Sequence, residues 1–98
     1  MYAALTLLKL KSEHYDRVTS AAKNAPERFR GRKGFICAVY YSDKEKNELG
    51  STTVWETKED FDSYWNSIPP EEMERVSGFT TEPFVQDKYE VITYFTSD

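Results

Sequence analysis

Few residues in this sequence could handle a proton, and they form no recognised catalytic set. His14 is the single histidine, so a base that works near neutral pH would first be sought there. Its place in the first turn of an expected helix favours an exposed surface position instead. Tyr40 is the second candidate for proton transfer. One histidine supports no Ser-His-Asp or Cys-His assignment, so the sequence does not establish whether the chain catalyses a reaction.

Aromatic residues are the better candidates for binding a ligand. Trp55 closes an expected strand, and its rigid indole could lie against a flat aromatic molecule. Packing in the core is the competing interpretation, because Trp is often largely buried. Further candidate ligand-binding residues are Thr6, Tyr64 and Tyr89. The sequence leaves open which strand tyrosines belong to a core, an interface or a pocket: Tyr40, Tyr41, Tyr89 and Tyr94.

Other reactive or charged side chains favour structural interpretations. Cys37 lies mid-strand among apolar neighbours, which predicts a buried, inert thiol. A basic run could gather an anionic ligand, although a solvated patch is favoured; it comprises Arg28, Arg30, Arg32 and Lys33. The acidic residues of segment 71–74 have no His or Cys partners at metal-ligand spacing, so we expect no metal site.

Hydrophobic periodicity and turn residues divide the chain into the elements that must position these side chains. Strands are expected over residues 2–11, 35–42, 51–55 and about 84–96, and helices over about 13–24 and from about 58 onward. A charged hairpin loop is expected over residues 43–50. Pro69-Pro70 ends the second helix and can open a short helix through residues 73–76, which Gly78 closes.

The clearest strand-to-helix junction lies between Trp55 and residue 65. Thr57 and Asp60 resemble an N-terminal capping box, because a hydroxyl at the N-cap can accept a free backbone N–H. The helix that follows carries apolar residues at positions i, i+3, i+4 and i+7, which predicts one buried face: Phe61, Tyr64, Trp65 and Ile68.

The element order predicts an α+β domain of the ferredoxin-like βαββαβ type, with a four-stranded antiparallel sheet and helices on one face. Two helices cover one face of a sheet, yet residues 35–41 are apolar on both sides. Large exposed apolar patches usually mark interaction surfaces. We therefore expect a homodimer paired through the sheet faces. The alternative is a monomer with an apolar face, or with a lid formed by residues 69–83.

Composition sets the broad class. Ninety-eight residues predict a single domain, residues 1–98, with a modest core. Thirteen Lys and Arg against seventeen Asp and Glu give a net charge of −4, which argues against a nucleic-acid or anionic-membrane partner. A lone cysteine predicts no intrachain disulfide and favours a reducing, cytoplasmic setting. The apolar run at residues 3–10 is too short to span a bilayer.

These features together resemble one known family. Gly34-Phe35 enters the second strand, Trp55-Glu56-Thr57 closes the third, and Glu59 lies in the acidic helix start. This pattern, with the element order over essentially the whole chain, resembles the antibiotic-biosynthesis-monooxygenase (ABM) domain family of dimeric α/β barrels. The resemblance implies a dimeric barrel with a ligand pocket between sheet and helices in each subunit. Relatives include cofactor-free monooxygenases and haem-degrading enzymes, so it implies no single reaction.

The haem-degrading relatives combine an Asn on the first strand, a Trp closing the third and a His on the helical segment beyond. Trp55 matches the Trp, Thr6 or a neighbour stands where the Asn would lie, and residues 66–78 contain no histidine. Haem ligation of that kind is therefore not expected.

The resemblance leads to a functional expectation: a cofactor-independent monooxygenase-like protein that binds a small aromatic or apolar ligand. The alternative is a non-catalytic ligand-binding or assembly module of the dimeric α/β barrel type. A haem-degrading or isomerase relative ranks below both.

Overall fold

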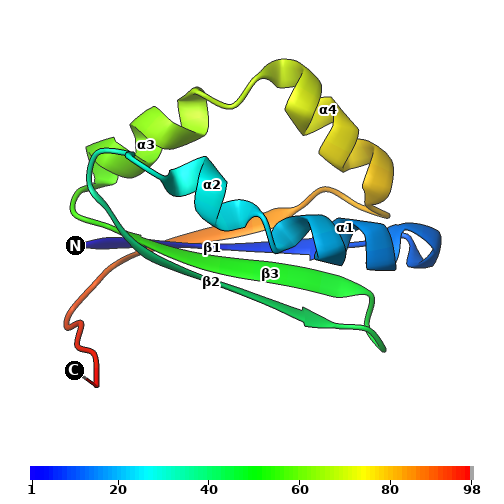
Figure 1. Cartoon of the computed structure of the whole chain (residues 1–98), viewed down its shortest axis with the longest axis horizontal. Helices are drawn as coiled ribbons and strands as arrows, with labels where there is room; N and C mark the ends of the chain where they lie inside the picture. The colour runs from blue at the N-terminus through cyan, green and yellow to red at the C-terminus, as the bar shows by residue number, and fades with distance from the viewer. Residues whose placement is uncertain (98) are drawn as a thin grey trace.

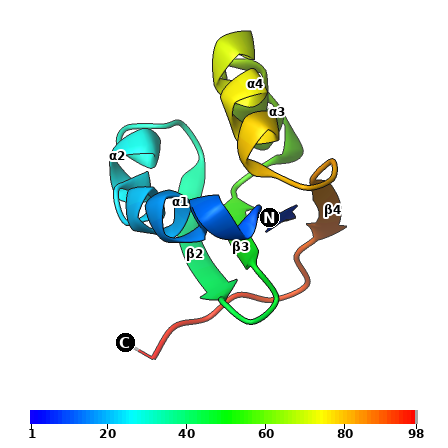
Figure 2. The same ribbon diagram turned by 90° about the vertical axis from the view of Figure 1, so that its right-hand side faces the viewer.

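The computed structural model describes residues 1–97 and contains one four-stranded sheet with all of its helices on one side (Figures 1 and 2). The strands are β1 (Tyr2–Lys9), β2 (Phe35–Asp43), β3 (Glu48–Trp55) and β4 (Val85–Glu90). The helices are η1 (Ser12–His14), α1 (Tyr15–Ala22), α2 (Ala25–Phe29), α3 (Lys58–Asn66) and α4 (Pro70–Phe79). The strand order is β2-β3-β1-β4, and every neighbouring pair is antiparallel. The predicted ferredoxin-like fold is therefore confirmed.

Several predicted boundaries are wrong for identifiable reasons. The hairpin loop is shorter than residues 43–50, because Asp43 pairs with Glu48 across the sheet. Its carboxylate accepts the backbone N–H groups of residues 45 and 46, and Asn47 adopts a φ of 54°. These features close a tight charged turn. The short helix expected to open at Pro69-Pro70 is α4, which begins at Pro70 as predicted but continues through Gly78, so Gly78 does not end it.

The last strand ends at Glu90 rather than near residue 96. Glu90 pairs with Tyr2, the first residue of β1, and the Val91 N–H donates to the Met1 carbonyl at 2.9 Å. Beyond this point β1 offers no further partner, and a strand requires paired backbone groups. Residues 91–97 instead pass beneath the sheet on the side away from the helices (Figure 2).

The predicted cap of α3 is confirmed, and it explains the glycine that enters β2. Thr57 Oγ1 accepts the Asp60 N–H at 3.0 Å. The Asp60 side chain is buried, and a Cβ on Gly34 would lie 2.0 Å from its Oδ2. Gly34 also has a φ of 78°, a conformation that favours glycine. Close packing and backbone conformation therefore both require glycine where the chain turns into β2.

The two faces of the sheet differ sharply. On the helix side, the row Phe35, Trp55 and Tyr2 lies under α2 and α3. We call the opposite side the open face; its register rows include Tyr41, Gly50, Leu7 and Val85, and next to them Val39, Thr52 and Leu5. Val39 is 58% exposed and Tyr41 46%. The predicted apolar, helix-free face is thus present in this chain.

Cys37 also lies on the open face and is half-buried rather than buried as predicted, because the helices cover the other side. A hydrogen bond with the Cys37 thiol raises the pKa of Tyr94 from its ordinary value. This contact ties the segment after β4 to the underside of β2.

Candidate functional site

Aromatic side chains fill one end of the space between sheet and helices. We call this group the aromatic cluster: Phe29, Phe35, Trp55, Phe61 and Tyr64. The Phe29 and Phe35 rings stack with centroids 4.7 Å apart, and Trp55 stacks on Tyr64 at 5.2 Å. Trp55 is fully buried, and its indole N–H donates to Thr53 Oγ1 at 2.9 Å. Around Trp55 the space between sheet and helices is therefore filled by packing.

The other end is hollow. A cavity of about 660 Å³, here called the main cavity, lies between the helix side of the sheet and the surrounding helices. Its volume falls within the range of small-molecule sites. Strand residues form its floor and helix residues its walls and roof; they include Thr6, Leu8, Ser51, Val18, Ile68, Met73, Val76 and Phe79. The lining is mostly apolar, which suits an aromatic or aliphatic ligand.

Four of the polar residues that line the main cavity lie close together: Arg28, Tyr40, Tyr64 and Glu72. Arg28 of α2 donates to the Tyr64 hydroxyl at 3.5 Å and forms an ion pair with Glu72 of α4. Tyr40 of β2 lies close enough to Tyr64 and Arg28 that both residues affect its pKa. Four chain segments therefore bring a cation, two phenols and a carboxylate to one side of an apolar space.

The electrostatics of this group set what each member can do. Burial raises the pKa of Tyr40; the neighbouring Tyr64 adds to the rise, and Arg28 opposes it. Tyr40 is therefore a hydrogen-bond donor at neutral pH and a poor base. Burial opposes the charge on Arg28, but its hydrogen bonds with Tyr64 and Glu72 outweigh this, and the pKa of Arg28 is raised. Arg28 is a fixed positive charge beside the cavity.

Thr6, Tyr40 and Tyr64 all line the main cavity. Thr6 Oγ1 accepts a hydrogen bond from the Gln86 amide at 3.0 Å, which holds the hydroxyl on the floor. The structure therefore brings these three residues from β1, β2 and α3 around one space. Whether they contact a ligand stays a prediction.

Trp55, His14 and Tyr89 lie outside the lining of the main cavity. The Trp55 ring stacks on Tyr64, which lines the cavity, and supports Tyr64 from behind. A role for Trp55 in ligand binding stays a prediction. His14 is half-buried, with its ring 5.3 Å from Phe79 and Nδ1 2.9 Å from the Arg17 guanidinium. Tyr89 is more than half exposed, and its pairing with Ala3 places it on the open face.

Sequence reasoning missed the pairing of Arg28 with Glu72. Arg28 was visible as part of a basic run, and Glu72 as an acid in the first turn of a helix. The two are 44 residues apart, and no sequence pattern joins them, because their contact depends on how α2 and α4 meet above the sheet.

Within residues 1–97, no helix is long and apolar enough to cross a membrane. Over the same residues, no three His, Cys, Asp or Glu side chains gather in a way that could hold a metal ion.

Comparison with known proteins identifies the fold. No protein-family model matches the chain, and no curated protein matches it in sequence. Solved structures do match. A Deinococcus radiodurans protein provisionally named an antibiotic biosynthesis monooxygenase has a TM-score of 0.81 at 12% identity, with 98% of this chain and 97% of that chain covered.

Two further matches carry functional names. The monooxygenase of the gene ActVA-Orf6 of Streptomyces coelicolor, solved in complex with nanaomycin D, has a TM-score of 0.75 at 14% identity, covering 99% of this chain and 92% of that one. A variant of SnoaB from Streptomyces nogalater, a cofactor-independent oxygenase, has a TM-score of 0.68 at 10% identity, covering 95% and 94%. The chain therefore has the fold of the antibiotic-biosynthesis-monooxygenase structures, as its sequence pattern predicted.

Proposed function

We propose that this chain is a cofactor-independent monooxygenase-like protein that binds a small aromatic or apolar molecule in the main cavity. The observation that carries the proposal is the apolar space of about 660 Å³ with Arg28, Tyr64, Tyr40 and Glu72 on one wall. Few polar groups in an apolar pocket are typical of sites that orient a ligand. The fold shared with the nanaomycin D complex and with SnoaB supports the same reading.

The chemistry suits a ligand that supplies its own electrons. When dioxygen oxidises an activated ring CH2 to a carbonyl, the carbon gives up four electrons. One oxygen atom stays in the product, and the other leaves as water with both hydrogens. The protein's contribution would be to desolvate the ligand and hold its anion in position. An electron-rich phenol or hydroquinone with such a carbon is the expected substrate class.

Each polar residue then has a role. Arg28 stabilises the negative charge that develops on the ligand oxygen. Tyr40 and Tyr64 donate hydrogen bonds to that oxygen, consistent with the raised pKa of Tyr40. Glu72 is the carboxylate beside this group that could accept a proton. Tyr40 is thus proposed as a donor, and His14, which lies outside the cavity lining, is not needed for this step.

We also propose that the protein is a homodimer that pairs through its open faces. The exposed apolar side chains there support this, since a folded chain rarely leaves such a surface to water: Val39, Tyr41, Val85 and Tyr89. A cytoplasmic location is proposed from the unpaired Cys37. Sedimentation of Val39→Lys beside the wild type tests the pairing: the variant should sediment as a monomer. A monomeric wild type at micromolar concentration would contradict it.

Oxygen uptake tests the proposed reaction. The wild type is incubated with a panel of phenols and hydroquinones, and ligand binding is followed separately by Trp fluorescence. Arg28→Gln should lower uptake about tenfold, because one charge-assisted contact to the developing anion is lost. Lys33→Gln, which removes a positive charge from a residue outside the cavity lining, is the matched control. Binding without uptake by the wild type would contradict catalysis and favour a non-catalytic ligand-binding module.

A further inference from the structure

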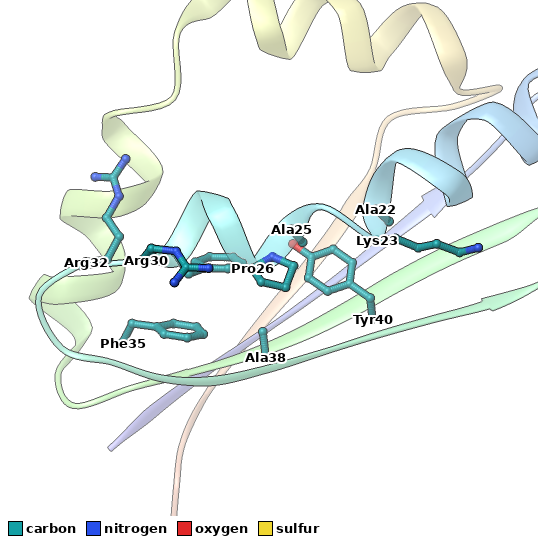
Figure 3. Close-up of a pocket in the computed structure, with 11 residues that line it drawn as sticks. Ala22, Lys23, Ala25, Pro26, Arg30, Arg32, Phe35, Ala38 and Tyr40 are labelled. Atoms are coloured by element: carbon teal, nitrogen blue, oxygen red, sulfur yellow. The ribbon is translucent and has the colours of Figure 1, made fainter.

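A second hollow, here called the edge cavity, lies between α2 and the helix side of β2 (Figure 3). Its volume is about 640 Å³. Phe35 and Ala38 of β2 lie on one side, and Pro26 and Arg30 lie across from them. Tyr40 lines this cavity and the main cavity. Its apolar surface, which includes the stacked Phe29 and Phe35 rings, could cover a ring or a branched aliphatic group.

The charged side chains that line the edge cavity all have one sign. Among residues 1–97, Lys23, Arg30 and Arg32 line it, and no Asp or Glu does. Glu27 pairs with Arg30 through two contacts of 2.9 and 3.3 Å. Three cations against one neighbouring carboxylate contrast with the chain's net charge of −4. The local field therefore favours an anion in a protein that is acidic overall.

We propose that the edge cavity binds a small amphipathic anion, an aromatic carboxylate, with its ring against Phe35 and Ala38 and its carboxylate at Arg30. A guanidinium has five N–H donors, and the Glu27 contacts use two of its nitrogens. Arg30 therefore retains donors for a second carboxylate. Lys23 and Arg32 add positive charge on either side.

This site is separate from the proposed oxygenation. It uses neither Arg28 nor Glu72, which do not line the edge cavity. It also lies on the helix side of β2, away from the open face, so pairing of open faces would leave it accessible. Failure of one proposal therefore leaves the other unaffected.

Calorimetric titration with two probes of one shape tests the charge requirement. 1-Naphthoate carries the carboxylate, and 1-naphthalenemethanol replaces it with a neutral group. Naphthoate should bind more tightly, and added salt should weaken it. Arg30→Gln should weaken naphthoate binding about tenfold. Glu27→Gln, which frees Arg30 from its partner, should tighten it severalfold. Lys33→Gln removes a loop charge outside the cavity and should leave affinity unchanged.

Backbone NMR shifts on naphthoate addition locate the site in the wild type. The largest changes are expected at Gly31, Phe35 and Ala38 of the edge cavity. Ala38→Leu, which fills the floor, should abolish binding while circular dichroism confirms the fold. Equal binding of both probes would overturn the proposal. So would shifts confined to Leu49 and Val76 of the main cavity, or equal losses in Arg30→Gln and Lys33→Gln.

Discussion

The helix side of the sheet has two ends that are built differently. At one end, the aromatic cluster closes around Trp55, and α3 buries Asp60, Phe61 and Tyr64. At the other, a smaller group centred on Leu10, Tyr15 and Leu49 lies beside the main cavity, and α4 buries no residue completely. The first end holds the fold together. The second leaves the space in which a ligand could bind.

This contrast explains why α4 is held by polar contacts. Arg28 pairs with Glu72 near its start, and the Lys11 N–H donates to the Phe79 carbonyl at 2.8 Å near its end. A helix with little buried surface has weak hydrophobic attachment. Local opening should therefore begin at α4 rather than α3.

Truncating one large aromatic residue at each end gives the largest expected difference. Trp55→Ala should lower the free energy of unfolding by about 3–5 kcal/mol, because it removes a fully buried ring and leaves a cavity. Phe79→Ala should cost about 1–2 kcal/mol, because Phe79 is only half-buried. Urea unfolding measures both. Equal losses would show that the two ends contribute alike to stability.

Gly31 and Gly34 lie in one loop, and their alanine variants distinguish the cost of a steric clash from the cost of backbone strain. Gly34→Ala at the closed end should cost about 2–4 kcal/mol, since the new Cβ would meet Asp60 and the φ is unfavourable. Gly31 has a similar φ of 76° but no atom within 4 Å of a new Cβ, so Gly31→Ala should cost about 1–2 kcal/mol. Thermal and urea unfolding of both variants measure the difference. A loss in Gly31→Ala as large as that in Gly34→Ala would mean that the Asp60 contact is unimportant.

Two helix-side positions of β3 both line the main cavity but differ in burial, because Thr53 is buried and Ser51 is half-buried. Ser51→Leu places a larger side chain on the floor of the main cavity and should change stability by less than about 1 kcal/mol. Thr53→Leu removes the acceptor of the Trp55 N–H at a buried position and should cost about 1–3 kcal/mol. Urea unfolding tests the pair. Ser51→Leu should also abolish ligand binding, and retained binding would place the ligand elsewhere.

The smallest expected effect is on alkaline stability. The pKa of Tyr40 is raised above its ordinary value of 10.0, so the folded chain holds this proton at a pH where the unfolded chain releases it. The free energy of unfolding should therefore decline above about pH 10, and this part of the decline should be absent in Tyr40→Phe. The effect should be small, since Tyr40 is 37% exposed. If the free energy of unfolding of the wild type and of Tyr40→Phe depended identically on pH, burial of Tyr40 would not contribute to the decline.

The sequence predicted the fold well because its signals are local. The Thr57 cap, the apolar face of α3 and the strand periodicity each lie within about ten residues, and the backbone follows them. The end of β4 could not be predicted from local signals, because it depends on where the neighbouring strand β1 begins. Residues 91–95 resemble a strand in sequence, but within residues 1–97 β1 has no further residue with which they could continue the ladder.

The candidate site was harder to predict for a related reason. Strands that are apolar on both sides do not reveal which side the helices cover, so Tyr89 and Tyr40 looked equivalent. The register places Tyr89 on the open face and Tyr40 under the helices. Trp55 stood out by its residue type, but the packing of five aromatic rings decides that it lies behind the main cavity rather than in its lining.

The ring of Tyr40 has a consequence for how molecules could pass through this domain. It borders both the main cavity and the edge cavity, as Ala22 and Ala25 also do. Its side chain is the largest of the three, so its removal should widen the connection between the two cavities. In Tyr40→Ala a longer molecule could thread from the rim of β2 toward α4. The size limit on what this protein accommodates would then depend largely on the Tyr40 side chain of an outer strand.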